Sequence, residues 1–143
     1  MNEKTQGIVF TNGCFDLIHS GHISYLKEAK SKGHYLIVGL NSDTSVKKIK
    51  GNTRPINNQS DRKFVLENLK PVDQVIIFDE ETPYELIKKI KPDILVKGGD
   101  WKVEDIVGHD IVLKNGGRVE SLHFVEDRST TSIIDKIRLQ YIK

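Results

Sequence analysis

Short apolar runs alternate with segments of helical periodicity along the whole chain. The apolar runs contain many β-branched residues and do not alternate with polar ones, which is typical of parallel strands buried on both faces. Between them, apolar side chains recur at the three- and four-residue spacing of one helix face. Repeated strand–helix units of this kind predict a doubly wound α/β fold with a parallel sheet. The five expected strands are Ile8–Phe10, Tyr35–Leu40, Gln74–Phe78, Ile94–Val96 and Val119–Phe124.

Capping and breaking residues indicate where the expected helices begin and end. Gly33 has the position of a C′ glycine that ends the first helix. Ser60 is expected to cap a helix over Asp61–Leu69. Thr82 and Glu85, with a proline between them, have the spacing of a capping box at the start of the next helix. Further helices are expected from near Val107 to Asn115 and from Thr130 towards Tyr141.

The one long segment without either pattern is Gly51–Gln59, which lies between two expected helices. Its Gly and Asn residues leave the backbone unconstrained, Arg54 lies within it and Arg62 follows it. We expect a mobile loop near the ligand-binding edge that becomes ordered when substrates bind.

Length and composition predict a single domain over residues 1–143 and exclude several classes of partner. A formal charge of +2, with basic residues spread along the chain, does not suit nucleic-acid binding. No apolar stretch reaches membrane-spanning length, and the N-terminus lacks a signal-peptide pattern. The single cysteine excludes an internal disulfide and suits a reducing compartment. We therefore expect a cytoplasmic protein without nucleic-acid or membrane partners.

The most informative stretch is Thr11–His22, where the first strand ends in a glycine turn and a helix opens. His19 and His22 are three residues apart, so both imidazoles lie on one face of the first helical turn. That turn also carries unpaired backbone N–H groups and the positive end of the helix dipole. Gly21, between the histidines, lets a ligand approach the backbone. The stretch predicts a phosphate site with two titratable positive charges.

Other functions of the same residues are less well supported. Zinc binding by His19 and His22 would require further ligands, and the sequence contains no second cluster with ligand spacing, so no metal ligands are expected. Cys14 is interpreted as a small residue in the phosphate turn rather than as a nucleophile. Walker A and G-x-G-x-x-G motifs are absent, so a P-loop kinase or a dehydrogenase lacks its usual phosphate site.

Polar clusters follow all five expected strands and should meet at one edge of the sheet, where open α/β sheets bind ligands. They are rich in cations and poor in catalytic carboxylates. This suits the attack of a phosphate oxygen on the α-phosphorus of a nucleoside triphosphate, which depends mainly on positioning and electrostatics. Which of Lys47, Lys48 and Lys50 faces the site stays open. The clusters are Thr11–His22, Asn41–Lys50, Asp79–Thr82, Lys97–Trp101 and Glu126–Thr131.

Two motifs resemble the signatures of the cytidylyltransferase-type nucleotidyltransferases, the HxGH family. Gly13–Asp16 with His19–His22 is similar to the GxFDxxHxGH block, and Ser129–Thr131 is similar to the Ser-Thr-Thr at a later helix start. The resemblance covers nearly the whole chain and implies a Rossmann-like fold and a homodimer. Segments similar to the bacterial enzymes that adenylylate D-glycero-β-D-manno-heptose 1-phosphate are Gly39–Asp43, Arg54–Asn57, Asp61-Arg62 and Leu95–Asp100.

The resemblance also implies roles for individual residues. His19, His22, Lys47 and Arg62 would be catalytic, and Asp16, Lys50 and Arg54 would bind the acceptor substrate. Mg²⁺ is expected as the partner of ATP, keeping most of its waters, so no protein ligands are assigned to it. The residues expected to bind the nucleotide are Thr11, Gly13, Cys14, Phe15, Gly21, Lys97, Gly99, Asp100, Arg128, Ser129 and Thr130.

Three functions follow as alternatives. The first is transfer of AMP from ATP to a sugar 1-phosphate, giving an ADP-sugar. The second is a cytidylyltransferase acting on glycerol 3-phosphate or another polyol phosphate, and the third is a nucleotide-binding module without catalysis. In the glycerol-phosphate branch an arginine precedes the Ser-Thr-Thr by about five residues, whereas Arg128 here is adjacent to Ser129. This departure favours ATP.

Overall fold

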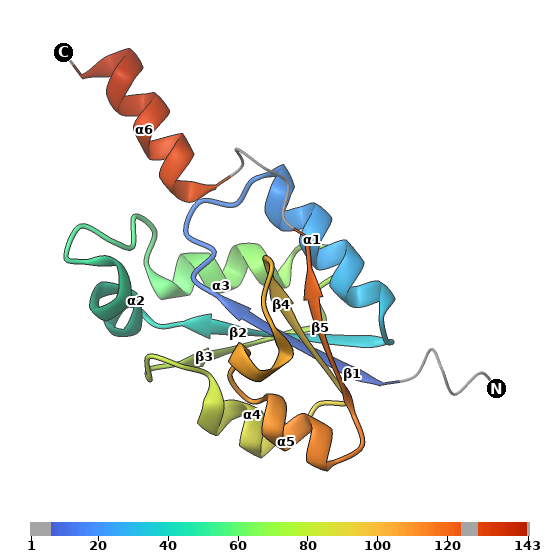
Figure 1. The fold of residues 1–143 in the computed structure, drawn as a ribbon. Helices are drawn as coiled ribbons and strands as arrows, with labels where there is room; N and C mark the ends of the chain where they lie inside the picture. Colours follow the sequence, from blue (N-terminus) through green and yellow to red (C-terminus); the bar gives the residue numbers. More distant parts are fainter. Residues whose placement is uncertain (1–6, 124–128, 143) are drawn as a thin grey trace.

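The five expected strands form one parallel sheet in the computed structural model, which describes residues 7–123 and 129–142. The strand order is β3-β2-β1-β4-β5, with β1 at the centre (Figure 1). The chain builds outward from β1 to β3 on one side and then crosses to β4 and β5 on the other, so the switch point lies between β1 and β4. The strands are β1 (Ile8–Gly13), β2 (Tyr35–Asn41), β3 (Gln74–Phe78), β4 (Ile94–Gly98) and β5 (Arg118–Leu122).

Register between the strands aligns their carboxyl ends. Gly13 of β1 pairs with Leu40 of β2, and Asn41 pairs with Phe78 of β3. Because the strands are all parallel, the loops that follow them emerge at one edge. The expected last strand ends at Leu122 rather than at Phe124, which lies outside the described residues.

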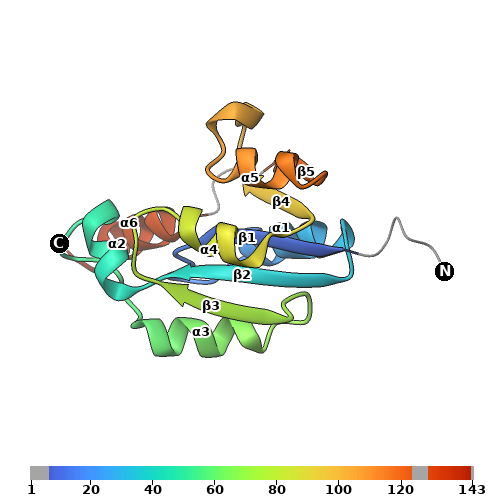
Figure 2. The same ribbon diagram turned by 90° about the horizontal axis from the view of Figure 1, so that it is seen from below.

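Helices cover both faces of the sheet, as a doubly wound fold requires. Figure 1 shows α1 and α3 on one face and α4 and α5 on the other, and in Figure 2 α4 and α5 lie in front of the sheet with α1 behind it. None of the helices in the described ranges is long and apolar enough to cross a bilayer. They are α1 (Ser20–Ser31), α2 (Asp43–Lys50), α3 (Gln59–Glu67), α4 (Tyr84–Ile90), the 3₁₀ turn η2 (Val103–Asp105), α5 (His109–Lys114) and α6 (Thr130–Tyr141).

Successive strand residues point to opposite faces, and this produces two core layers. Val9 packs in the layer under α1 and α3, together with Leu26 and Leu66. Its neighbour Phe10 packs in the layer under α4 and α5, together with Ile87. All five of these side chains are fully buried, and each contributes roughly 1.5–3 kcal/mol of transfer free energy. Both faces of β1 are therefore apolar, as its uninterrupted hydrophobic run predicts.

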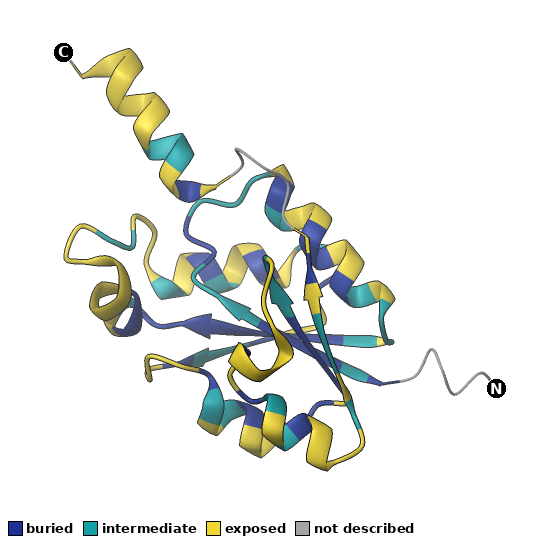
Figure 3. Ribbon diagram, in the orientation of Figure 1, coloured by how far each residue is buried: buried dark blue, intermediate teal, exposed yellow. Residues whose placement is uncertain are grey.

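Helix α6 differs from the other long helices in its burial. Figure 1 shows it projecting from the body, and Figure 3 shows that most of its surface is exposed. Thr130, its first residue, is buried, whereas Leu139 and Tyr141 near its end are 86% and 77% exposed. The rest of the fold therefore packs against the start of α6, whereas most of the remaining helix is exposed.

Two of the expected helix caps are wrong. Asn58, not Ser60, caps α3, and its side chain accepts a hydrogen bond from Asp61 N at 2.9 Å. Several consecutive residues there are able to cap, and the periodicity of the helix does not distinguish between them. At α4 the N-cap position is taken by Pro83, with no side-chain cap bond, so the capping box between Thr82 and Glu85 does not form.

Gly33 lies at the expected position after α1, but for a different reason. Its φ angle is outside the left-handed region that usually selects a C′ glycine. A Cβ atom there would lie 2.5 Å from Gly7 O and 2.8 Å from Val9 Cγ2. Glycine therefore permits the close approach of the α1–β2 turn to the start of β1.

Candidate active site

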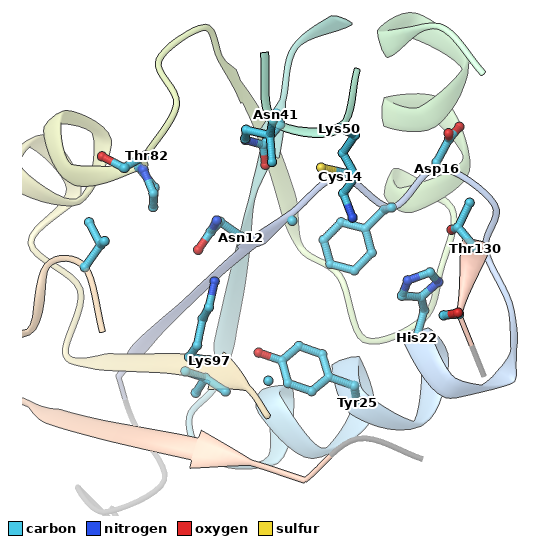
Figure 4. A pocket seen from close by; sticks show the side chains of 18 of the residues that line it. Asn12, Cys14, Asp16, His22, Tyr25, Asn41, Lys50, Thr82, Lys97 and Thr130 are labelled. Carbon is cyan, nitrogen blue, oxygen red and sulfur yellow. The ribbon is translucent and has the colours of Figure 1, made fainter. Parts of the chain in front are cut away.

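A cavity of about 630 Å³ lies at the carboxyl edge of the sheet. The loops that follow β1, β2, β3 and β4 contribute to it, as does the start of α6 (Figure 4). The polar clusters that are scattered along the sequence therefore meet, as the parallel topology predicts. The lining residues are Asn12, Gly13, Cys14, Phe15, Asp16, His19, His22, Tyr25, Asn41, Ile49, Lys50, Arg54, Glu81, Thr82, Pro83, Leu95, Val96, Lys97, Gly98, Ile106, Val107, Ser129, Thr130 and Thr131.

The two histidines form a stacked pair at the start of α1. His19 is the N-cap residue, and its Nδ1 accepts a hydrogen bond from Gly21 N at 3.1 Å. The ring centroids of His19 and His22 are 3.9 Å apart with an interplanar angle of 30°. Phe15 packs against the other side of the pair, with its ring centroid 5.1 Å from that of His22. Both imidazoles thus face the cavity from the first helical turn.

The pocket environment removes the charge of His22 at neutral pH. Burial, followed by the proximity of His19, lowers the pKa of His22 from 6.5 to about 4. Its Nδ1 is buried and has no hydrogen-bond partner among the described residues. A bound phosphate would offer an acceptor and a negative charge, and both favour the protonated imidazole. The positive charge expected at this position is therefore one that an anionic ligand would induce.

The start of α6 faces the histidine pair (Figure 4). Ser129 caps this helix through a reciprocal pair of hydrogen bonds with Ser132, at 2.9 and 3.1 Å. Thr130 Oγ1 accepts a hydrogen bond from Leu17 N at 3.1 Å, which ties α6 to the β1–α1 segment. The N-termini of two 12-residue helices therefore open onto one cavity, and both favour an anion there.

Gly13 and Phe15 shape the turn before the histidines. Phe15 adopts a left-handed φ of 45° and is 6% exposed. A Cβ atom at Gly13 would lie 2.8 Å from Phe15 Cε2, so glycine allows the ring to fold back over the turn. Between them, burial raises the pKa of the Cys14 thiol, which disfavours the reactive thiolate.

Arg62 does not line the cavity, so the expectation that it contacts a substrate phosphate needs correction. The residue is 1% exposed, and its guanidinium already donates to four acceptors. These belong to the phosphate turn, the end of β2, the start of α2 and the loop before α3. The bonds are Nη1 to Cys14 O and to Asn41 O, Nη2 to Asp43 Oδ1 and Nε to Asn57 O, at 2.8–2.9 Å. Arg62 is a buried clamp that positions the site.

Asp16 has a similar role toward the loop at 51–58, and this overturns the reason for expecting an unconstrained loop. Its buried carboxylate accepts from Ile56 N at 2.7 Å and from Asn57 N at 2.9 Å. It also pairs with Arg54 Nε at 3.0 Å, and the side chain of Arg54 is 11% exposed. The carboxylate of Asp16 is therefore occupied by the loop, and Arg54, which pairs with it, also lines the cavity.

The structure also shows which of the lysines that follow β2 lines the cavity. Lys50, at the end of α2, points into the cavity, and Lys97 points into it from the end of β4 (Figure 4). Lys47, expected to be catalytic, is exposed and does not line the cavity. Lys50 lies three positions after Lys47, and the last turn of α2 brings Lys50 but not Lys47 to the edge. Burial lowers the pKa of Lys97, whose ammonium lies 5.4 Å from the ring centre of Trp101.

Several residues expected to bind the nucleotide lie away from the cavity wall. Thr11 is fully buried, and its Oγ1 is 2.6 Å from Tyr25 Oη, so it supports the wall from behind. Gly21 lies buried in the first turn of α1. Gly99 adopts a φ of 106° in the turn after β4, and Asp100 is exposed beyond it. Arg128 lies outside the described residues.

Sequence reasoning placed four further cavity residues in the polar clusters at this edge without giving them a role, and it missed Tyr25. Asn12 and Asn41 lie near or at the carboxyl ends of β1 and β2, and Tyr25 reaches in from the second turn of α1. Glu81 and Thr82 line the far end. An asparagine that interrupts an apolar run at a strand end is the one signal that could have identified the first two, because such residues are unfavourable in strands.

Comparisons with known proteins find the same family that the sequence motifs resemble. A family model described as cytidylyltransferase-like matches residues 10–136. A protein named Bifunctional protein HldE from Nitratiruptor sp. is 54% identical over 138 residues, and its namesake from Geobacter metallireducens is 55% identical over 141 residues. These alignments cover 96% and 97% of this chain but 29% of each relative, so the chain spans less than a third of their length.

Solved structures show the same fold. The lipopolysaccharide core biosynthesis protein from Thermoplasma volcanium is 32% identical, with a TM-score of 0.66, over 82% of this chain and 95% of that one. A pantothenate synthetase from Thermus thermophilus shares the fold at 13% identity, with a TM-score of 0.56, over 85% of this chain and 57% of its own.

Replacing the buried clamp should destabilise the protein strongly. Arg62→Met leaves buried carbonyls and the Asp43 carboxylate without their donor, and we expect a loss of about 3 kcal/mol in the free energy of unfolding. Urea denaturation measures it. Arg118→Met is the matched control, because Arg118 is exposed and pairs with Glu120 two residues further along β5; this variant should stay within about 0.5 kcal/mol of the wild type. Equal stability losses in the two variants would contradict the clamp.

The lowered pKa of His22 predicts a defined pH dependence of stability. Between pH 6.5 and about 4 the unfolded chain binds a proton at this position that the folded chain does not. His22 therefore contributes a loss of stability as the pH falls through this range, and none above it. Urea midpoints measured at pH 7 and pH 5 should differ less in His22→Gln than in the wild type. His123→Gln, at an exposed position, should keep the wild-type difference, and a wild-type difference in His22→Gln would refute the prediction.

Proposed function

The chain belongs to the cytidylyltransferase-like family, and from that premise we propose that it transfers AMP from ATP to a sugar 1-phosphate. The products are an ADP-sugar and pyrophosphate. We propose D-glycero-D-manno-heptose 1-phosphate as the acceptor. Its support is the identity of 50–57% to several proteins named Bifunctional protein HldE over more than nine-tenths of this chain.

The observation that carries the proposal is the stacked histidine pair where two helix N-termini meet. His19 and His22 lie at the start of α1, and Ser129–Thr131 lie at the start of α6 on the same cavity. Lys50, Arg54 and Lys97 add cationic groups to the wall. Such an arrangement suits two polyanions brought together, because it offers donors and positive charge with few competing carboxylates.

The reaction needs no strong general base. An oxygen of the acceptor phosphate, whose second pKa is about 6, is already largely ionised at pH 7 and attacks the α-phosphorus. The new P–O bond forms as the bond from the α-phosphorus to the bridging oxygen breaks, and that oxygen leaves with pyrophosphate. His19 and His22 stabilise charge on the α- and β-phosphoryl oxygens, while Lys50 and Lys97 reduce the repulsion between the two substrates.

Mg²⁺ belongs to the proposal as the partner of the triphosphate. When bound, the ion neutralises charge on the phosphate oxygens, and it usually keeps several waters and few protein ligands. The described residues hold no group of three or more His, Cys, Asp or Glu side chains placed to bind a metal. The carboxylate of Asp16 is already bonded to the loop at 51–58. The donor set therefore fits an ion held mainly by ATP.

We also propose that the protein acts in the cytoplasm as a homodimer. Its proposed nucleotide substrate and its single thiol both suit a reducing compartment. The apolar side chains of Ile137, Leu139 and Ile142, which are 47–86% exposed at the end of the chain, would gain from burial against a second copy.

Nucleotide and acceptor selectivity test the proposal directly. Pyrophosphate release should be measured with ATP, CTP, GTP and UTP against heptose 1-phosphate, other sugar 1-phosphates and glycerol 3-phosphate. We expect ATP to exceed CTP by at least about tenfold in kcat/KM, which requires only about 1.4 kcal/mol of differential transition-state binding.

Product mass identifies the nucleotide that has been transferred. A CDP-linked product in excess would place the chain among the cytidylyltransferases, an alternative that the name of the family favours. Nucleotide binding without turnover on any phosphate would indicate a binding module instead.

A further inference from the structure

The cavity extends well beyond its phosphate-binding end. Figure 4 shows Thr82 on the opposite side of the cavity from His22 and Thr130, with Asn12 and Lys97 between them. The remote part, here called the distal lobe, is marked by Asn41 and Thr82, with Glu81 next to Thr82 in the chain and Asn12 at its inner boundary; Ile106 and Val107 add apolar lining to the same cavity. These residues come from four different segments of the chain, so the lobe is a product of the fold rather than of one motif.

We propose that the distal lobe binds the hydroxyl groups of the acceptor sugar and thereby selects a polyhydroxylated acceptor. This inference rests on the proposed function, since it assigns one half of the cavity to one of the two proposed substrates. It extends that function by naming residues which determine acceptor specificity.

The side chains of the distal lobe match hydroxyl groups better than phosphates or a base. Two amides, a carboxylate and a hydroxyl provide both donors and acceptors, as vicinal hydroxyls require. The carboxylate of Glu81 would repel a triphosphate but accepts hydrogen bonds from hydroxyls. Asn12 makes no side-chain hydrogen bond within residues 7–123 and 129–142, so its amide is available to a ligand. Ile106 and Val107 suit the apolar face of a sugar ring.

The distal lobe is also held rigidly, which favours selective binding. Asn41 is 3% exposed, and its Nδ2 donates to Ser45 Oγ at 3.0 Å. Ser45 Oγ in turn donates to Glu80 O at 2.7 Å, and Ser42 N donates to Phe78 O at 2.9 Å. These bonds tie the β3–α4 loop, which carries Glu81 and Thr82, to the β2–α2 segment. The Asn41 side chain and the backbone of the β3–α4 loop are therefore positioned before a ligand arrives.

The positions of Lys97 and Lys50 suit a sugar phosphate whose sugar lies in the distal lobe. Lys97 lies between the distal lobe and the histidine pair, and Lys50 points into the cavity near Cys14 (Figure 4). A sugar seated in the distal lobe would direct its phosphate toward these ammonium groups. The phosphate would then approach the α-phosphorus from the side opposite to the leaving pyrophosphate, which an in-line displacement requires.

Steady-state kinetics with both substrates varied tests the assignment. Glu81→Gln and Thr82→Val should each raise KM for the sugar 1-phosphate at least about fivefold, while KM for ATP stays within about twofold of the wild type. Thr82→Ser retains the hydroxyl and should restore KM. Glu80→Gln is the matched control, since it removes an adjacent charge that does not line the cavity. The three positions changed in these four variants are exposed loop positions, and circular dichroism verifies that the variants fold.

The outcomes separate this inference from the proposed function. A wild-type protein that turns over no sugar phosphate with any nucleotide would overturn the proposed function and this inference with it. An active wild type whose KM for the sugar phosphate is unaffected by Glu81→Gln and Thr82→Val would overturn the inference alone. A rise in KM for ATP instead would show that the distal lobe binds the nucleoside, and would also overturn it.

Discussion

The buried guanidinium of Arg62 is the constraint on which the ligand-binding edge depends. It bonds at once to the phosphate turn, the end of β2, the start of α2 and the loop before α3. Burying a charge this completely is costly, and the four acceptors, one of them the Asp43 carboxylate, offset that cost. Asp16 anchors the same loop through a second buried charge. The walls of the cavity are thus held in place by two buried charges that are already bonded to the protein.

The groups that do face the ligand have a different electrostatic state. His22 is kept neutral by burial, and the two helix N-termini present the positive ends of their dipoles to the cavity. Lys50 and Lys97 supply the positive charge in the middle of the cavity. A preorganised site of donors in a shielded cavity stabilises developing charge more effectively than the same groups in water. The division into positioning charges and ligand-facing donors is what the proposed phosphoryl chemistry requires.

The sequence predicts the fold and the location of the site well, because both depend on patterns that are local. Buried parallel strands have uninterrupted apolar runs, and parallel topology alone brings their carboxyl ends together. The histidine pair follows from helical spacing. The sequence does not reveal which way an individual side chain points. Lys47 and Lys50 lie about one helical turn apart on α2, and only the position of the end of this helix decides which of them lines the cavity. The same holds for Arg62, because an arginine that binds phosphate and one that clamps four carbonyl and carboxylate groups look alike in sequence. The sequence places Glu81 and Thr82 in a polar cluster at this edge, but it assigns them no role, because they resemble ordinary loop residues until β3 and α4 bring them to the cavity.

The central claim is that the stacked histidine pair stabilises the transition state of nucleotidyl transfer. The most direct measurement is the turnover of His19→Ala and His22→Ala with saturating ATP and sugar 1-phosphate, with circular dichroism and urea denaturation to establish that each variant folds. Loss of a transition-state donor predicts a fall in kcat of at least about a hundredfold for each variant. Near-wild-type turnover in both folded variants would contradict the account.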